Sequence, residues 1–359
     1  MSTTSMRLGE LLEQLGQRNQ TVRADLPLPA DLSGANDAES SPWYIKALVG
    51  VAAWIAAFFL GAFLGVAGLI DSTESMMIFG VVLIVIAVVL KRLTRHSIFW
   101  GQLAFAVVLA GQGLLIAGFA SREVDPTTVA LFVVLLEVVI FALYPDSLHR
   151  MLSVMAIIAA INFLLYEQEM PELVHGLIFL LAVGAVAVWQ AEFRLLASRW
   201  FPIRAPLGYG LVLSLFALCL LTLVDYYEIR LWWLSAAGLA LVLLYLAYRL
   251  LHELERPLAS PVGLWALVAV ALLLIPAYQT PGILAAVIVL LLGFWRNNVL
   301  LMGLATLFLL FFLSAYYYNL DIILLNKSYI LMGTGVVLLA LRFAFQRVVG
   351  GPTLDSEQT

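Results

Sequence analysis

Long apolar segments, separated by short polar ones, recur along almost the whole chain. An α-helix needs about 20 apolar residues to cross the hydrocarbon core of a membrane, and the segments have about this length. Of the 359 residues, 63% are hydrophobic and 12% are charged, whereas about a quarter of a soluble domain is charged. The sequence therefore predicts an all-α, polytopic membrane helix bundle in contact with the lipid bilayer.

The number of apolar segments predicts about twelve transmembrane helices. Some segments are short for a hydrocarbon core of about 30 Å, and burial among neighbouring helices or local thinning of the bilayer accommodates such spans. The expected spans are residues 45–70, 76–91, 97–120, 127–145, 148–166, 172–190, 206–224, 231–249, 262–278, 282–295, 298–316 and 323–346.

The polar ends of the chain define the expected domains. Residues 1–41 are predicted to form a cytoplasmic arm, in which a short amphipathic helix precedes a linker rich in Pro, Ser and Asp. Residues 42–348 are expected to form the transmembrane helical domain, and residues 349–359 a cytoplasmic tail. The leucines that share one face of the arm helix are Leu8, Leu11, Leu12 and Leu15.

The distribution of basic residues between the loops supports this transmembrane topology. With a cytoplasmic N-terminus and twelve spans, Arg122, Arg230 and Lys327 are the only ones of the 19 Lys and Arg residues that fall outside. Cytoplasmic loops of membrane proteins carry an excess of Lys and Arg. We therefore expect a multi-pass protein with both termini in the cytoplasm.

Two segments hint at repeated helical hairpins. Residues 224–249 and 316–342 share a tyrosine pair, a polar loop and a glycine-containing apolar helix that ends in Arg. Duplicated hairpins are common in membrane transporters. Shared composition explains the likeness equally well, so both interpretations stay open.

The chain also resembles a known family. The stretches PWYIKALVGVAAWIAAFFLGAFLG (42–65) and GFWRNNVLLMGLATLFLLFFLSAYYYNLDIILLNKSYILMGTGVVLLALR (293–342) are similar to a bacterial family described as domain of unknown function 4401. The resemblance implies a multispanning protein of the bacterial inner (plasma) membrane. The family has no established activity, so no catalytic residue can be carried over.

Sequence motifs of catalysis and cofactor binding are missing. There is no Gly-rich phosphate loop, no dinucleotide-binding fingerprint and no nucleophile elbow. The four histidines are scattered, Cys219 is the single cysteine, and no basic-aromatic patch suggests a nucleic acid. We therefore expect no cofactor, no metal and no nucleic-acid partner, and no catalytic motif is visible.

Polar residues at membrane depth are the candidates for function, because ionisable groups in a bilayer are rare and costly. Glu137 lies near the middle of its span, and Gln112 on the preceding helix lies at a similar depth. We expect Glu137 to be uncharged and turned toward other helices, with Gln112 as its partner. Asn162 and His175, near the outer surface, form a second candidate pair. For each of them, packing between helices is the alternative role.

A second candidate site lies at the outer face. Tyr317 and Tyr318 either form part of an aromatic belt or line a ligand site, and Asp321 either caps the last helix or contributes to the site. Lys327 is predicted to lie about 8 Å inside the outer leaflet. There it either reaches the interface or forms a salt bridge with Asp225 or Asp321.

These residues favour a transporter- or flippase-like protein with a polar site around Glu137 and an outward-facing pocket. The alternative is a non-catalytic membrane scaffold, or an accessory subunit that works through a membrane-protein partner. An enzyme that acts on lipid ranks third, since no nucleophile with a neighbouring base is visible.

Overall fold

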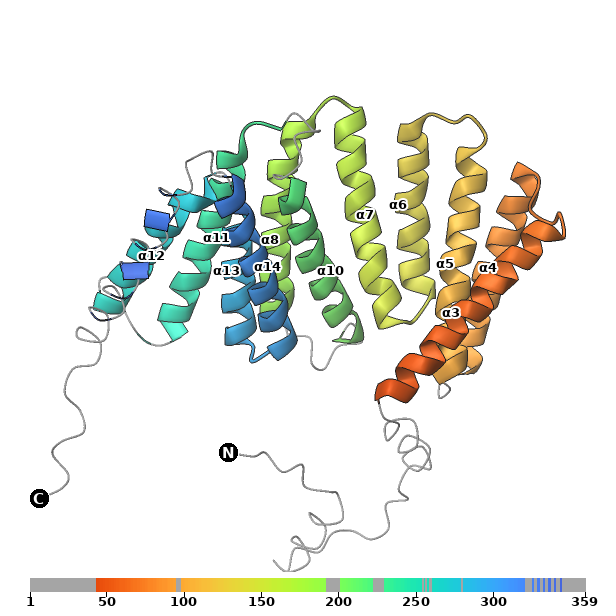
Figure 1. The fold of residues 1–359 in the computed structure, drawn as a ribbon, viewed down its shortest axis with the longest axis horizontal. Helices are drawn as coiled ribbons and strands as arrows, with labels where there is room; N and C mark the ends of the chain where they lie inside the picture. The colour runs from red at the N-terminus through yellow and green to blue at the C-terminus, as the bar shows by residue number, and fades with distance from the viewer. Residues whose placement is uncertain are drawn as a thin grey trace, which may run out of the picture. The chain divides into compact units, whose positions relative to one another are not determined.

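The computed structural model describes residues 43–94, 98–191, 201–221, 229–253, 260–278 and 280–319, together with a few isolated positions. These residues form eleven α-helices and one short 3₁₀-helix, with no β-strand among them (Figure 1). The helices are α3 (Trp43–Val66), α4 (Thr73–Leu93), α5 (Ile98–Ala120), α6 (Pro126–Leu143), α7 (Ser147–Glu167), η1 (Pro171–Leu173), α8 (Val174–Gln190), α10 (Phe201–Leu220), α11 (Trp232–Glu253), α12 (Pro261–Ala277), α13 (Gly282–Trp295) and α14 (Val299–Asn319).

Each of the first eleven predicted spans coincides with one of these α-helices. The all-α prediction is therefore confirmed for the described residues. Among the described residues, eight helices are long and apolar enough to cross a membrane. This is the pattern of a multi-pass membrane protein. The twelfth span, the arm, the tail and most of the second repeat segment lie outside the described residues, so the count of about twelve stays a prediction.

Contacts divide the chain into two compact units. One holds the described residues up to Asp71 together with Phe79–Gln112, and the other holds Ser72–Ile78 and the described residues from Gly113 onward. In the first unit, the ring of Trp54 on α3 meets that of Phe105 on α5 edge-on at 5.6 Å. Gly111 on α5 lies against the backbone of Gly80 on α4, where a Cβ would approach to 2.9 Å.

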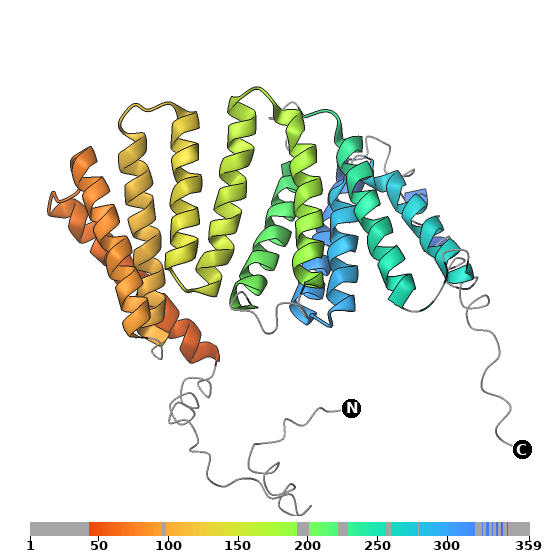
Figure 2. The same ribbon diagram turned by 180° about the vertical axis from the view of Figure 1, so that it is seen from behind.

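The second unit is built from helical hairpins. Helices α6 and α7 pack as an antiparallel pair, α10 packs against both α7 and α8, and α13 packs against α14; Figures 1 and 2 show α8 and α10 side by side. The apolar core lies among α8, α10, α11, α13 and α14. At its centre Phe216 stacks on Phe308, with ring centroids 4.3 Å apart.

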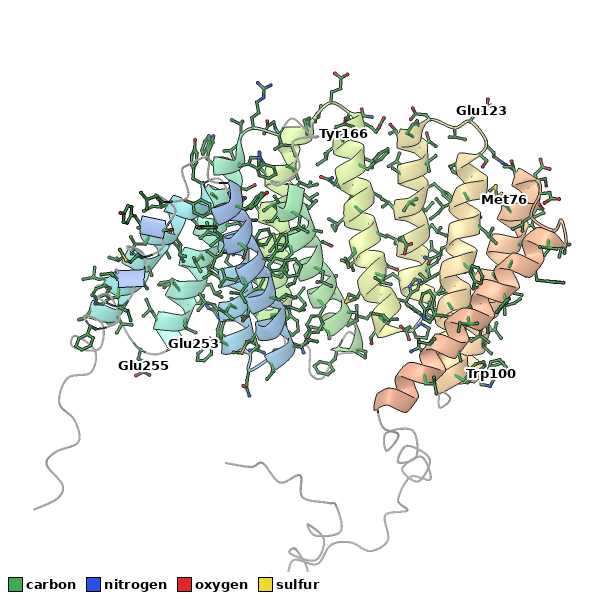
Figure 3. All side chains as sticks on the ribbon, in the orientation of Figure 1. Met76, Trp100, Glu123, Tyr166, Glu253 and Glu255 are labelled. Carbon is green, nitrogen blue, oxygen red and sulfur yellow. The ribbon has the colours of Figure 1, made fainter. Side chains whose placement is uncertain are left out.

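The two ends of this unit differ in charge. Figure 3 labels Tyr166 and Glu123 at one end and Glu253 at the other, and we call these the Tyr166 end and the Glu253 end. Among the described residues, at the Tyr166 end the acidic residues outnumber Arg122 and Arg230, and at the Glu253 end the arginines outnumber the acidic residues Asp146, Glu253 and Glu255. The acidic residues of the Tyr166 end are Glu123, Asp125, Glu167, Glu169 and Glu172, and the arginines of the Glu253 end are Arg150, Arg204, Arg249 and Arg296.

Candidate functional site

Glu137 is one of the buried residues of α6. Its side chain is 6% exposed, and the other buried residues of α6 are Ala130 and Ile140. Residues three, four and seven positions apart share one face of a helix, so Glu137 continues the stripe that Ala130 and Val133 begin. The carboxyl group is therefore turned toward neighbouring helices rather than lipid, as the sequence predicted.

The facing stripe of α7 carries two further buried polar residues, His149 and Ser153. The hydroxyl Oγ of Ser153 lies 3.2 Å from Nδ1 of His149, four residues earlier on the helix. Asp146 caps this helix by accepting hydrogen bonds from the backbone N–H groups of Leu148 and His149, at 3.0 and 3.1 Å. The stripe therefore runs from the cap of α7 into the bundle.

Tyr144 completes this group from the end of α6. Its ring meets that of His149 edge-on, with centroids 5.0 Å apart, and its side chain is fully buried. We call Glu137, Ser153, His149 and Tyr144 the buried column.

An apolar hollow of about 620 Å³ lies beside the column, between α6 and α7 near the Tyr166 end. On α6 its lining reaches Val133, one helical turn from Glu137. The interface between α6 and α7 is therefore hollow and apolar toward the Tyr166 end, and its buried residues toward the Glu253 end include the polar side chains of the column. We call this space the α6–α7 hollow.

A second hollow of about 730 Å³ lies on the other flank of α7, against α10. Most of its lining is apolar, but Asn162 and Ser214 face it as well. Ser214 is 3% exposed, and its hydroxyl has no hydrogen-bond partner among the described residues. Tyr166, labelled in Figure 3, lines the same space near its helix end. We call this space the α7–α10 hollow.

His175 has partners other than Asn162. Its Nδ1 lies 2.7 Å from Oγ of Ser235 on α11, and its Nε2 lies 2.8 Å from Oε2 of Glu172. Both ring nitrogens are thus engaged, and the pair that the sequence suggested between Asn162 and His175 is not formed. Asn162 belongs instead to the α7–α10 hollow.

The remaining predicted residues are spread over the chain. Gln112 is buried on α5, and its pairing with Glu137 stays a prediction because the two residues belong to different units. On α14, Tyr317 is half-buried and Tyr318 is 84% exposed. The predicted outer-face residues Asp225, Asp321 and Lys327 lie outside the described residues. Among the residues that are described, no cluster of three or more His, Cys, Asp or Glu side chains could hold a metal.

Sequence reasoning missed Ser153, His149 and Ser214 as members of the site. The sequence did hold a signal for His149 and Ser153. The two residues are four apart and therefore share one helical face. Ser153 also follows Pro145 by as many residues as Glu137 precedes it, which predicts that the two lie at the same level of the hairpin. Ser214 offered no such signal, since a single serine in an apolar helix usually bonds to its own backbone.

Comparison with known proteins adds the family. No curated protein and no solved structure shows significant similarity to the chain. The model of one family, described as a domain of unknown function (DUF4401), matches residues 42–348, which is most of the sequence. The chain is therefore a member of this family of unknown function.

Proposed function

We propose that the protein is a transporter- or flippase-like membrane protein that takes an amphiphilic substrate into the α7–α10 hollow. The observation that supports this is the buried Ser214 hydroxyl, which faces the hollow and has no partner among the described residues. A buried polar group without a hydrogen bond is costly, so a ligand that supplies one is favoured at this position.

The lining of the hollow defines the chemistry of the substrate. Asn162 lies five residues, about 8 Å, before the end of α7, and Ser214 lies six residues, about 9 Å, before the end of α10. Two hydrogen-bonding side chains at this depth, in a mostly apolar space that Tyr166 and Glu167 also line at the helix end, suit an apolar chain that carries a carbonyl or hydroxyl oxygen. A volume of about 730 Å³ is within the usual range of small-molecule sites.

The charges of the second unit suggest how it is oriented. Arginines gather toward the Glu253 end, which by the positive-inside bias is cytoplasmic. The hollow then opens toward the outer side of a bacterial inner membrane, with residues 1–41 and 349–359 in the cytoplasm. Glu137, near the middle of this arrangement, is the protonatable site of the transport cycle.

A lipid-flipping assay tests the proposal. The probe is phosphatidylethanolamine with a fluorescent NBD label in vesicles that contain the purified protein, and dithionite added outside bleaches only the outer leaflet. The wild-type protein should raise the bleached fraction above that of protein-free vesicles, since the inner-leaflet lipid becomes accessible. Ser214→Ala and Asn162→Leu should reduce the rate of this extra bleaching.

The matched control is Ser314→Ala, because Ser314 lies on α14 and is exposed. It should behave like the wild type. If wild-type vesicles bleach no further than protein-free vesicles, the proposal fails. The alternative, a non-catalytic scaffold or accessory subunit that works through a membrane-protein partner, would then be favoured.

A further inference from the structure

The polar residues of the buried column continue to the surface of the protein at the α6–α7 turn. Asp146, His149 and Ser153 follow one another on α7 at intervals of three and four residues, which places them on a single face. Asp146 is partly exposed at the α6–α7 turn, whereas His149 and Ser153 are each 1% exposed. The polar stripe therefore leads from the surface of the Glu253 end into the interior of the unit.

The stripe ends at the level of Glu137. In an antiparallel hairpin, residues at equal distance from the turn lie side by side, and Glu137 and Ser153 are each eight residues, or about 12 Å along the helix, from Pro145. Both residues are buried, and α6 and α7 pack against each other. Beyond Glu137 toward the other end, the lining of the α6–α7 hollow is apolar.

We propose that Glu137 exchanges its proton with the Glu253 end of the protein through Ser153 and His149. This inference rests on the proposed function only in taking Glu137 as a protonatable site, and it involves neither the α7–α10 hollow nor a substrate. The Glu253 end is thus the side of the membrane with which the carboxyl group of Glu137 equilibrates.

The transfer is balanced at each step. The carboxylic acid of Glu137 gives its proton to a water molecule that bridges to Ser153, whose partner among the described residues is His149. The hydroxyl of Ser153 accepts that proton and passes its own to Nδ1 of His149. The carboxylate of Glu137 and an imidazolium result, and the imidazolium releases the proton on Nε2 toward water near Asp146. Reprotonation of Glu137 runs in reverse.

Few charged groups compete for this proton. From α6, Glu137 and Tyr144 share the buried face that meets His149, and from α7 Asp146 and Arg150 lie within one turn of it. The Nε of Arg150 donates to the backbone oxygen of Phe141 at 3.1 Å, so this guanidinium lies at the turn between α6 and α7. Along its contact with Met151 and Val154, α10 contributes Gly210, which has no titratable group.

Carbodiimide labelling tests the proposal, because dicyclohexylcarbodiimide enters apolar sites and reacts with the protonated form of a carboxyl group. Sealed membrane vesicles of both orientations are prepared from cells that make the full chain, and labelling of Glu137 is measured by mass spectrometry. Only the outside buffer is changed, from about pH 6 to about pH 8. The vesicles that expose the Glu253 end are identified by impermeant maleimide labelling of Ser147→Cys in a Cys219→Ala background.

In vesicles that expose the Glu253 end, alkaline buffer should slow labelling of Glu137 by roughly tenfold, since a single site loses up to about tenfold in protonated fraction per pH unit above its pKa. In vesicles of the opposite orientation the rate should stay constant. Ser153→Ala and His149→Gln should abolish the response, while His252→Gln, a change at an exposed histidine, should preserve it.

Three results would overturn the inference: a response only from the Tyr166 end, no response from either side, or a full response in both column variants. If His149→Gln does not fold, the milder Ser153→Ala decides the matter. The lipid-flipping assay is independent of this measurement, so failure of the substrate proposal and failure of the proton path are distinguished.

Discussion

Nδ1 of His175 on α8 lies 2.7 Å from Oγ of Ser235 on α11, and this contact joins the two helices at the Tyr166 end. The same imidazole meets Oε2 of Glu172 through Nε2 at 2.8 Å. Glu172 in turn accepts a hydrogen bond from the backbone N–H of Arg230 at 3.0 Å. The chain before α11 is thus held to the start of α8 by one carboxylate and one imidazole.

Removal of the Ser235 hydroxyl should weaken this connection. Ser235→Ala leaves Nδ1 of His175 buried without its partner, and we expect a loss of about 1 kcal/mol in the free energy of unfolding. Thermal unfolding of the purified protein in detergent measures this loss. Ser314→Ala, at an exposed position, should leave the melting temperature unchanged; equal effects of the two changes would show that the contact contributes nothing.

Close packing of α13 on α14 should make Gly282 intolerant of a side chain. A Cβ at this position would lie 2.5 Å from ring carbons of Phe312, which is fully buried. Gly282→Ala should therefore lower stability by about 1–3 kcal/mol. Phe312→Leu in the same chain should recover part of the loss, because it removes the ring.

Gly303 on α14 is the matched control for this change. A Cβ there meets nothing within 4 Å, so Gly303→Ala should be neutral or raise helix stability by up to about 1 kcal/mol. Chemical unfolding of both variants in the same detergent compares them. Destabilisation by Gly303→Ala as large as that by Gly282→Ala would contradict the packing explanation.

A glycine should fit better than the natural residue at position 169. Glu169 follows α7 with a φ of 57°, and the N–H of Met170 bonds to the oxygen of Leu165 at 2.9 Å, as in a glycine-terminated helix. Because the left-handed conformation disfavours residues with a Cβ, Glu169→Gly should raise stability by about 1 kcal/mol. Glu167→Gly, at the last residue of α7, should not raise stability, and the two melting temperatures distinguish the cases.

Cysteines at opposite ends of α6 test the transmembrane topology. Ser121 and Ser147 are both exposed and are separated by one helix and its turns. In a Cys219→Ala background, Ser121→Cys should react with an impermeant maleimide in intact spheroplasts, and Ser147→Cys should react only after the membrane is opened. The opposite pattern would place the Glu253 end outside and reverse the orientation that the basic residues predict.

The positions of the helices were largely predictable because a membrane restricts the length and polarity of each segment that crosses it. A span must be apolar over about 20 residues and must satisfy its own backbone hydrogen bonds, so helix ends follow directly from where polar residues return. Pro126 and the capping Asp125 mark the start of α6, and Asp146 marks the start of α7. Each of the eleven described helices was predicted from its apolar run.

The partners of the polar residues were less predictable. Depth alone suggested Asn162 as a partner for His175, whereas the ring bonds to Ser235, 60 residues away. Depth gives one coordinate of a side chain, and the rotation of each helix and the identity of its neighbours give the others. Neither of these is encoded in hydropathy.

By itself the sequence determined that the chain is helical, where most helices begin and end, and that Glu137 is buried away from lipid, since each follows from the cost of exposing polar groups to hydrocarbon. Only the tertiary structure decided that α10 packs against both α7 and α8, that Ser214 faces a hollow with Asn162, and that His149 and Ser153 lie on the stripe facing α6. Apolar helix surfaces match many partners almost equally well in lipid, so close packing at positions such as Gly210 and Gly282 selects among them.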